Sequence, residues 1–140
     1  MAKLFVFEVH TPHRPFFSEK VEAIVLALVD GEIGVYAGHS PFTAPSVTGA
    51  LRIRDRNGKW RPAFITEGIL EVKEHKTVLM VDAAEWPEEI DTERAKAAKR
   101  EAGETLDTGM LKFEIDKARV KLKRAEWRLK VAEMKEQPAV

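Results

Sequence analysis

Four charged side chains near the C-terminus have the types and spacing of an anion-binding site. Asp91 and Arg94 are three residues apart, and Arg124 and Arg128 are four apart, so each pair shares one face if its segment is helical. If the two segments fold against each other, three guanidinium groups converge, and their planar donors suit phosphate oxygens. Glu85 and Asp91 then become acceptors for an adenine amine or ribose hydroxyls. The alternative interpretation is a solvated helix face, the usual role of arginines on an amphipathic helix.

Other residues of catalytic or metal-binding type do not form a recognisable site. His10 and His13 flank Pro12 in an expected turn, with no carboxylate at metal-ligand spacing. The chain has no cysteine, which excludes disulfides and thiolate zinc sites. The glycines of the run 30–42 match neither the dinucleotide fingerprint nor the Walker-type phosphate loop, so they are assigned to tight turns in a β-domain. We therefore expect no catalytic centre, no metal and no required cofactor.

The composition is that of a globular chain with balanced charge. Its 140 residues, 44% of them hydrophobic, fit one compact domain or a small domain with an appendage. Lysine plus arginine number 23, as do aspartate plus glutamate. This zero balance argues against a general nucleic-acid binder, which would show a basic excess. No apolar run reaches membrane-spanning length, and the N-terminus lacks a secretory signal layout. We expect an intracellular protein without direct membrane insertion, which reaches a membrane only through other subunits.

The first half of the chain has the alternation of β-strands. The Asn57-Gly58 pair predicts a hairpin turn between two of them. Short strands with turns between them are typical of an antiparallel sandwich or barrel. The expected strands lie at 4–9, 21–29, 51–54, 60–66, 70–73 and 78–81.

After Ala84 the hydrophobic period changes to that of helices. Asp91 is a candidate N-cap for a helix that we expect to end near Ala102, because Gly103 and the stretch 105–109 break the pattern. A longer helix is expected from Leu111 onward. The last five residues, 136–140, are expected to form a frayed tail.

The two helical segments carry opposite charge. Residues 85–107 hold eight acidic and four basic side chains, a net charge of −4. Residues 111–135 hold nine basic and four acidic side chains, a net charge of +5. This complementarity favours an antiparallel hairpin, although each exposed ion pair contributes little. It leaves a strongly basic long helix if the hairpin opens.

The longer helix is apolar on two opposite faces. A surface helix normally keeps its far face polar, and full burial of one large apolar side chain gains roughly 1.5–3 kcal/mol. Either both stripes belong to one static core, or the helix changes partners. The first stripe is a heptad seam of Leu111, Ile115, Ala118, Leu122, Ala125, Leu129 and Ala132. The second stripe recurs every seven residues and consists of Phe113, Val120, Trp127 and Met134.

Several short motifs lie in a specific order along the chain. Those of the first half are TP at 11–12, DGEIGV at 30–35 running into GHSP at 38–41, and FITEGILEV at 64–72. Those of the second half are AAE at 83–85, IDTERA at 90–95, KRA at 123–125 and VAEM at 131–134. Together they resemble the bacterial epsilon subunit of F-type ATP synthases over nearly the whole chain.

The resemblance implies an α+β fold, with an N-terminal antiparallel β-sandwich over 1–84 and a C-terminal two-helix antiparallel hairpin over 85–140. It implies a non-catalytic central-stalk subunit of a proton-translocating ATP synthase, peripheral on the cytoplasmic face of a bacterial cell membrane. The sandwich is expected to contact the gamma subunit and the c ring. The extended C-terminal helix is expected to reach the catalytic head, where similar proteins block ATP hydrolysis.

Some members of that family bind ATP in the folded form, through a motif that reads Ile/Leu-Asp-x-x-Arg-Ala. A regulatory ATP is therefore implied here too, although the chain departs from the family pattern at Gly103, at 107–109 and at Pro87. The runner-up hypothesis is a free-standing ATP sensor, and an enzyme ranks last. The residues that match the family's nucleotide contacts are Glu85, Ile90, Asp91, Arg94, Ala95, Arg124 and Arg128.

Overall fold

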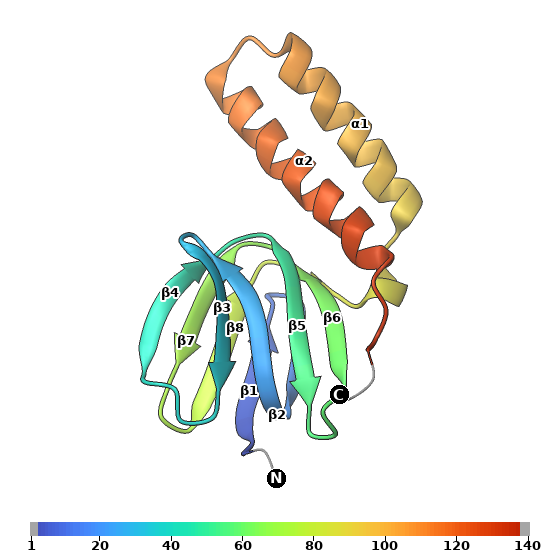
Figure 1. Ribbon diagram of the computed structural model, residues 1–140. Coiled ribbons are helices and arrows are strands. Elements are labelled where there is room, and N and C mark those ends of the chain that lie inside the picture. The colour runs from blue at the N-terminus through green and yellow to red at the C-terminus, as the bar shows by residue number, and fades with distance from the viewer. Residues whose placement is uncertain (1–2, 138–140) are drawn as a thin grey trace.

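The alternating apolar residues of the first half fold into strands that bury one face each. A computed structural model describes residues 3–137, and the strands within this range form a two-layered sandwich (Figure 1). The strands are β1 (Phe5–His10), β2 (Pro15–Leu28), β3 (Gly31–Tyr36), β4 (Phe42–Ser46), β5 (Gly49–Asp55), β6 (Trp60–Ile65), β7 (Gly68–Val72), β8 (Lys76–Val81) and β9 (Ala84–Glu85).

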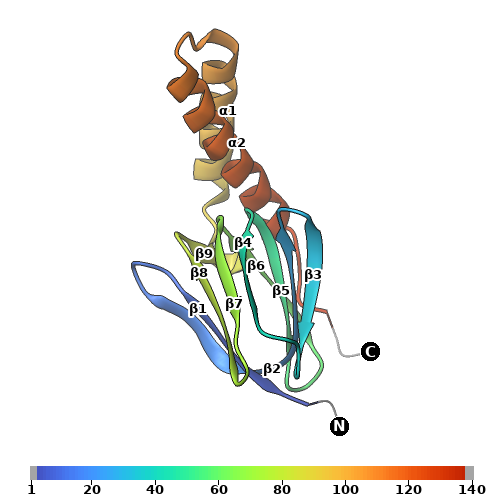
Figure 2. The same cartoon turned by 90° about the vertical axis from the view of Figure 1, so that its left-hand side faces the viewer.

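The long strand β2 joins the two layers. Its first half pairs with β1, and its second half pairs with β3 and β5. Figure 2 shows β1, β8 and β7 on one side of the sandwich and β5 and β3 on the other. The described pairings are antiparallel except that of β1 with β8, which is parallel. The predicted sandwich is confirmed, with this one parallel pair.

The hydrophobic core lies between the two layers of the sandwich, and Trp86 covers it where the chain leaves the sandwich for the helices. Phe7, Leu26 and Leu79 have no exposed surface there. Trp86, just after β9, stacks on Phe16 with ring centroids 4.5 Å apart. The segment that leaves the sandwich is therefore packed onto it, which fixes where the helices begin.

Helix α1 (Thr92–Thr108) begins at the predicted cap, where the Asp91 carboxylate accepts a hydrogen bond from the Arg94 backbone N–H at 3.0 Å. The prediction that it ends near Ala102 is wrong, because the helix continues through Gly103 and its C-cap is Gly109. A helical glycine costs about 1 kcal/mol. Packing of α1 against the second helix, with Ala95 and Ala102 buried, offsets that cost.

The second helix, α2 (Lys112–Ala132), runs antiparallel to α1, so the predicted hairpin is confirmed (Figure 1). A short 3-10 helix, η1 (Pro87–Glu89), precedes α1. The hairpin interface is built on small side chains that let the two helices approach closely. Its buried alanines, each pair seven residues apart, are Ala95 and Ala102 in α1 and Ala118 and Ala125 in α2.

The second apolar stripe of α2 is divided between two environments. Trp127 and Met134 pack against a cluster that contains Phe64 of the sandwich. Phe113 and Val120, nearer the tip of the hairpin, are 67% and 44% exposed. The lower part of the stripe thus docks the hairpin, whereas the upper part is exposed.

Part of the expected frayed tail is ordered. Gln137 pairs with Trp60 of β6 through two backbone hydrogen bonds, which is why the prediction is wrong for 136–137. Residues 138–140, the rest of that tail, lie outside the described residues. Among the described residues, no helix combines the length and apolar character needed to cross a membrane.

Candidate nucleotide groove between the helices and the sandwich

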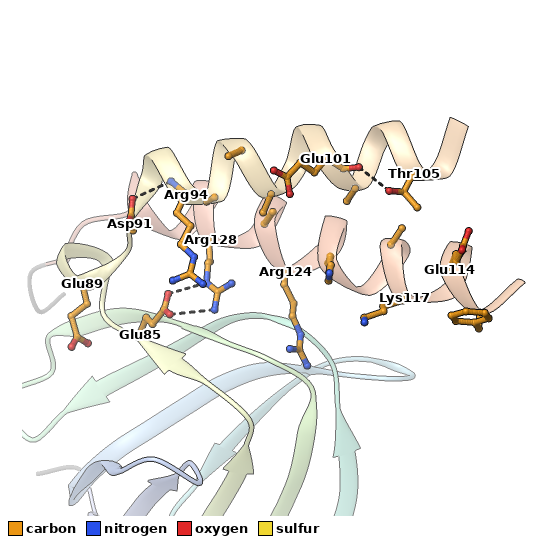
Figure 3. A pocket seen from close by; sticks show the side chains of 18 residues that line it. Glu85, Glu89, Asp91, Arg94, Glu101, Thr105, Glu114, Lys117, Arg124 and Arg128 are labelled. Carbon is orange, nitrogen blue, oxygen red and sulfur yellow. Dashed lines mark hydrogen bonds and ion pairs between the residues drawn. The ribbon is translucent and has the colours of Figure 1, made fainter. Parts of the chain in front are cut away.

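A groove of about 940 Å³ is lined by α1, α2 and the segment between β9 and α1. Figure 3 shows Glu85, Arg94 and Arg128 together near the start of α1, whereas Arg124 stands apart from them and points toward the sandwich. Of the seven predicted site residues, the one that does not line the groove is Ile90. The other six are Glu85, Asp91, Arg94, Ala95, Arg124 and Arg128.

Arg128 is held in a bidentate ion pair. Its Nε donates to Oε1 of Glu85 at 3.0 Å, and a terminal nitrogen donates to Oε2 at 3.2 Å. The guanidinium carbon also lies 4.6 Å from the centre of the Phe64 ring. Two parallel hydrogen bonds and a ring face fix the guanidinium plane, so Arg128 is preorganised. Both oxygens of Glu85 are occupied by this pair.

Arg124 lines the groove, but its guanidinium points toward the sandwich and not toward Arg94 and Arg128. It donates to Oε1 of Glu67 and, at 3.3 Å, to Oδ2 of Asp82. Thr48 donates its hydroxyl to the second oxygen of Glu67. Burial raises the pKa of the Glu67 carboxyl, but the hydrogen bonds from Thr48 and Arg124 outweigh burial and lower this pKa from 4.5 to about 2. Glu67 is thus an anion at neutral pH and binds α2 to the sandwich.

Arg94 is the least engaged of the three arginines. Its backbone N–H binds the Asp91 carboxylate, whereas its guanidinium has no hydrogen-bond or ion-pair partner among residues 3–137. Figure 3 shows this side chain pointing toward the Glu85–Arg128 pair. The structure therefore brings Arg94 and Arg128 together and directs Arg124 elsewhere.

Three of the predicted residues, Ile90, Asp91 and Ala95, support the fold through packing or helix capping. Ile90 is buried in the cluster with Phe64 and Val131, and Ala95 is buried against α2. The Asp91 carboxylate caps α1, which satisfies a backbone donor that would otherwise have no partner within the helix. These residues position the groove and the start of α1.

Two lysines of the groove were missed in the sequence. Lys117 and Lys121 of α2 line it together with the predicted arginines. The signal was available, because Lys117, Lys121, Arg124 and Arg128 are spaced four, three and four apart and therefore share one helix face. The positive end of the α1 dipole lies close to Arg94, so this basic face offers donors for an anion. The same lining also carries acidic groups, the carboxylates of Glu85, Glu89, Asp91, Glu101 and Glu114. The described residues contain no group of three potential metal ligands.

Two domain families match consecutive parts of the chain, together residues 4–133. The family described as ATP synthase, Delta/Epsilon chain, beta-sandwich domain matches residues 4–87. The family described as ATP synthase, Delta/Epsilon chain, long alpha-helix domain matches residues 88–133. The junction between the two matches coincides with η1, where the chain leaves the sandwich.

Relatives of known name agree with these domain matches. The chain is 48% identical over 129 residues to the ATP synthase epsilon chain of Caldicellulosiruptor saccharolyticus, which covers 92% of this chain and 93% of that one. It is 44% identical over 133 residues to the ATP synthase epsilon chain of Caldanaerobacter subterraneus. That match covers 94% of this chain and 96% of the relative.

Solved structures show the same fold at lower identity. A chain of the Euglena gracilis mitochondrial ATP synthase superposes with a TM-score of 0.80 at 23% identity, covering 94% of this chain and 82% of that one. A chain from the central stalk and c-ring structure of the Tetrahymena thermophila mitochondrial ATP synthase superposes with a TM-score of 0.66 at 12% identity. The match covers 94% of this chain and 98% of that one. From both domain matches and from the 48% identity to a named epsilon chain, the protein belongs to the family of ATP synthase delta/epsilon chains.

Proposed function

We propose that this chain is a non-catalytic central-stalk subunit of an F-type ATP synthase, peripheral on the cytoplasmic face of a bacterial membrane. The observation that carries the proposal is the match of both domains, in order, to one subunit family. The sandwich docks on the gamma subunit and the c ring and transmits torque as a rigid body. Ile69 and Met80, paired neighbours on β7 and β8, are 46% and 41% exposed and supply adjacent apolar surface for a partner.

The hairpin is the regulatory element in this proposal. α1 and α2 pack along each other, whereas the sandwich and η1 are contacted mainly by the C-terminal part of α2 (Figure 1). Such an end-on attachment allows the hairpin to leave the sandwich as a unit. Extended, α2 presents its basic side chains to acidic surface of the catalytic head, with Phe113 and Val120 meeting apolar surface, and blocks ATP hydrolysis.

ATP is the ligand proposed for the groove. Arg94, unpaired among the described residues, and the preorganised Arg128 are the first phosphate contacts, with Lys117 and Lys121 farther along the same face. Arg124 joins them only after leaving Glu67. A ligand that binds the folded hairpin alone shifts the population toward it by its differential affinity for the two states. ATP would thus relieve the block that the extended hairpin imposes.

The test of the regulatory role is a deletion in the assembled complex. Because β9 pairs with β6 and Trp86 packs on Phe16, the deletion should remove 90–140 and leave the sandwich complete. Higher ATP hydrolysis than with the full chain is expected. Unchanged hydrolysis under inhibitory conditions contradicts the inhibitor role. Co-purification with the gamma subunit and the c ring separates a stalk subunit from a free-standing ATP sensor.

A further inference from the structure

The chain does not end where α2 ends. After Glu133, the C-cap of α2, it leaves the helix and continues beside β6 (Figure 1). Met134 packs with Phe64, Ile90 and Val131. The three residues that follow lie against the start of β6, far from the tip of the hairpin. The end of α2 and the sandwich are therefore joined by a segment that belongs to neither.

Two backbone hydrogen bonds fasten this segment to β6. The N–H of Trp60 donates to the carbonyl of Gln137 at 3.0 Å, and the N–H of Gln137 donates to the carbonyl of Trp60 at 2.9 Å. A reciprocal pair of this kind is one closely spaced rung of an antiparallel ladder. Gln137 thus adds a single rung of a further strand to the free edge of β6.

Pro62 keeps this addition short. Trp60 and Pro62 direct their backbones to the same edge of β6, because alternate residues of a strand face the same neighbour. Proline has no N–H to donate, so the ladder cannot continue past Trp60. Farther along, Phe64 pairs with Glu85 of β9. The edge therefore offers one isolated docking position.

Ionic contacts align the segment in this position. Glu136 forms ion pairs with Lys59 and, at 3.5 Å, with Arg61, the residues on either side of Trp60. The hydrogen bond from Lys59 lowers the pKa of the Glu136 carboxyl, so it stays charged well below neutral pH. These side chains border a groove of about 530 Å³ whose other wall includes Trp86 and Met134. The contacts are solvent-exposed, so each contributes little by itself.

We propose that residues 134–137 form a releasable clasp that holds the helical hairpin in its folded position on the sandwich. The segment is covalently continuous with α2, so the hairpin cannot leave the sandwich until the rung at Trp60 and the Glu136 ion pairs break. One rung and two exposed ion pairs shift the equilibrium between the folded and the extended hairpin toward the folded form, but they still allow the hairpin to extend. The clasp's role in regulation rests on the proposed function, but its effect on the hairpin belongs to the isolated chain.

The test compares three chains that differ only at the C-terminus. The full chain is compared with one that ends at Lys135, which lacks the clasp contacts, and one that ends at Gln137, which retains them. The sequence has no native cysteine, so His75→Cys and Lys99→Cys, both exposed, place spin labels on the sandwich and on α1. Distances between the labels then report the ratio of extended to folded hairpin.

The chain ending at Lys135 should show a ratio roughly 5–30 times that of the full chain, as loss of one or two kcal/mol implies. The chain ending at Gln137 should match the full chain. Equal ratios in all three chains overturn the proposal, as does an equal rise in both truncated chains. Hydrolysis by the assembled complex is a separate measurement, so failure of the regulatory role does not affect this result.

A single substitution in the full-length chain tests the clasp without shortening the protein. Gln137→Pro removes the N–H that donates to Trp60 while keeping the chain length. It should raise the extended fraction and accelerate hydrogen exchange at the Trp60 amide, with exchange at the amides that pair β6 with β5 unchanged. Unchanged exchange at Trp60 in this variant would show that the clasp does not form in solution.

Discussion

Arg124 donates to the carboxylate of Glu67, so a predicted phosphate contact is bound to the sandwich. Glu67 is oriented in turn by the hydroxyl of Thr48, which is buried. Asp82 accepts a further hydrogen bond from the same guanidinium. The Nε of Arg124 is buried without a partner among the described residues. One arginine therefore connects α2 to two acidic groups of the sandwich and retains an unused donor.

The Glu67 contact should give hairpin docking a defined acid dependence. The pKa of Glu67 is about 2 in the folded chain, below its usual 4.5, so the charged form favours folding. This contribution is fully present above about pH 4.5, falls as the pH decreases toward 2, and is lost below that value. The free energy of unfolding of Glu67→Gln should therefore lie below that of the unsubstituted chain at pH 6 and approach it near pH 2.

A second substitution identifies the cause of that dependence. Thr48→Val removes the hydroxyl donor but keeps the side-chain shape, so it should raise the pKa of Glu67, measured by NMR titration of its carboxyl carbon. Parallel stability curves for Glu67→Gln and the unsubstituted chain over pH 2–6 would contradict the proposed role of the carboxylate.

The sequence predicted secondary-structure elements well where one hydrophobic periodicity dominates. It failed where tertiary contacts determine the end of an element or its pairing. The capped start of α1 is a local signal, because the Asp91 side chain reaches a backbone N–H three residues away. Its continuation past Gly103 depends on packing against α2, which local propensity does not include. The rung between Trp60 and Gln137 joins positions that no short-range pattern relates.

In the candidate site, too, the local features could be predicted from the sequence and the tertiary contacts could not. Spacing placed Arg124 and Arg128 on one helix face, and both line the groove in the structure. The basic face of α2 was visible in the sequence. The direction of Arg124 was not, because Glu67 and Asp82 come from turns of the sandwich that only the fold brings beside α2. The exposed Phe113 and buried Val131 likewise reflect how far α2 projects from the sandwich.

Gly103 offers a test of the hairpin's own stability. It lies inside α1, and a Cβ built on it meets no atom within 4 Å. Gly103→Ala should raise the free energy of unfolding of the hairpin by about 0.5–1 kcal/mol, because alanine loses less backbone freedom on forming a helix. Hydrogen exchange of the α1 amides measures this. No added protection would mean that α1 is not helical at this position in solution.

Gly68 is the matched contrast in the sandwich. A Cβ there would lie 1.9 Å from the Met80 carbonyl oxygen, so the neighbouring strand β8 would have to move. Gly68→Ala should lower the free energy of unfolding by about 1–3 kcal/mol, the usual cost of overpacking. Thermal unfolding followed by circular dichroism measures the loss, and an unchanged midpoint would refute the close approach of β7 and β8.

Two valines of α2 test whether the hairpin is docked on the sandwich through the C-terminal end of the helix. Val131 is fully buried against Phe64 and Ile90, whereas Val120 is 44% exposed on the same helix. Val131→Ala should cost about 1–3 kcal/mol of stability and raise the extended fraction of the hairpin, because it leaves a cavity at the docking end. Val120→Ala should change stability by less than about 0.5 kcal/mol. Equal effects would mean that the hairpin is not docked through its C-terminal end.

Arg94 provides the cleanest test of nucleotide binding, because the residue is exposed. Among residues 3–137 its guanidinium has no ion-pair partner, unlike those of Arg124 and Arg128. Arg94→Ala should leave the free energy of unfolding within about 0.5 kcal/mol. It should weaken ATP binding by about tenfold to a hundredfold, the loss expected for a charge-assisted hydrogen bond to phosphate.

The matched control for Arg94 is Arg100, which is exposed on the same helix and does not line the groove. Arg100→Ala removes the same charge, so a general electrostatic effect would weaken ATP binding equally in both variants. Arg124→Ala differs from both, because it should lower ATP affinity and also release the hairpin from Glu67. Calorimetric titration with ATP, paired with unfolding of each variant, therefore separates a phosphate contact from a docking contact. ATP binding that is unchanged in Arg94→Ala contradicts the assignment of the groove as the nucleotide site.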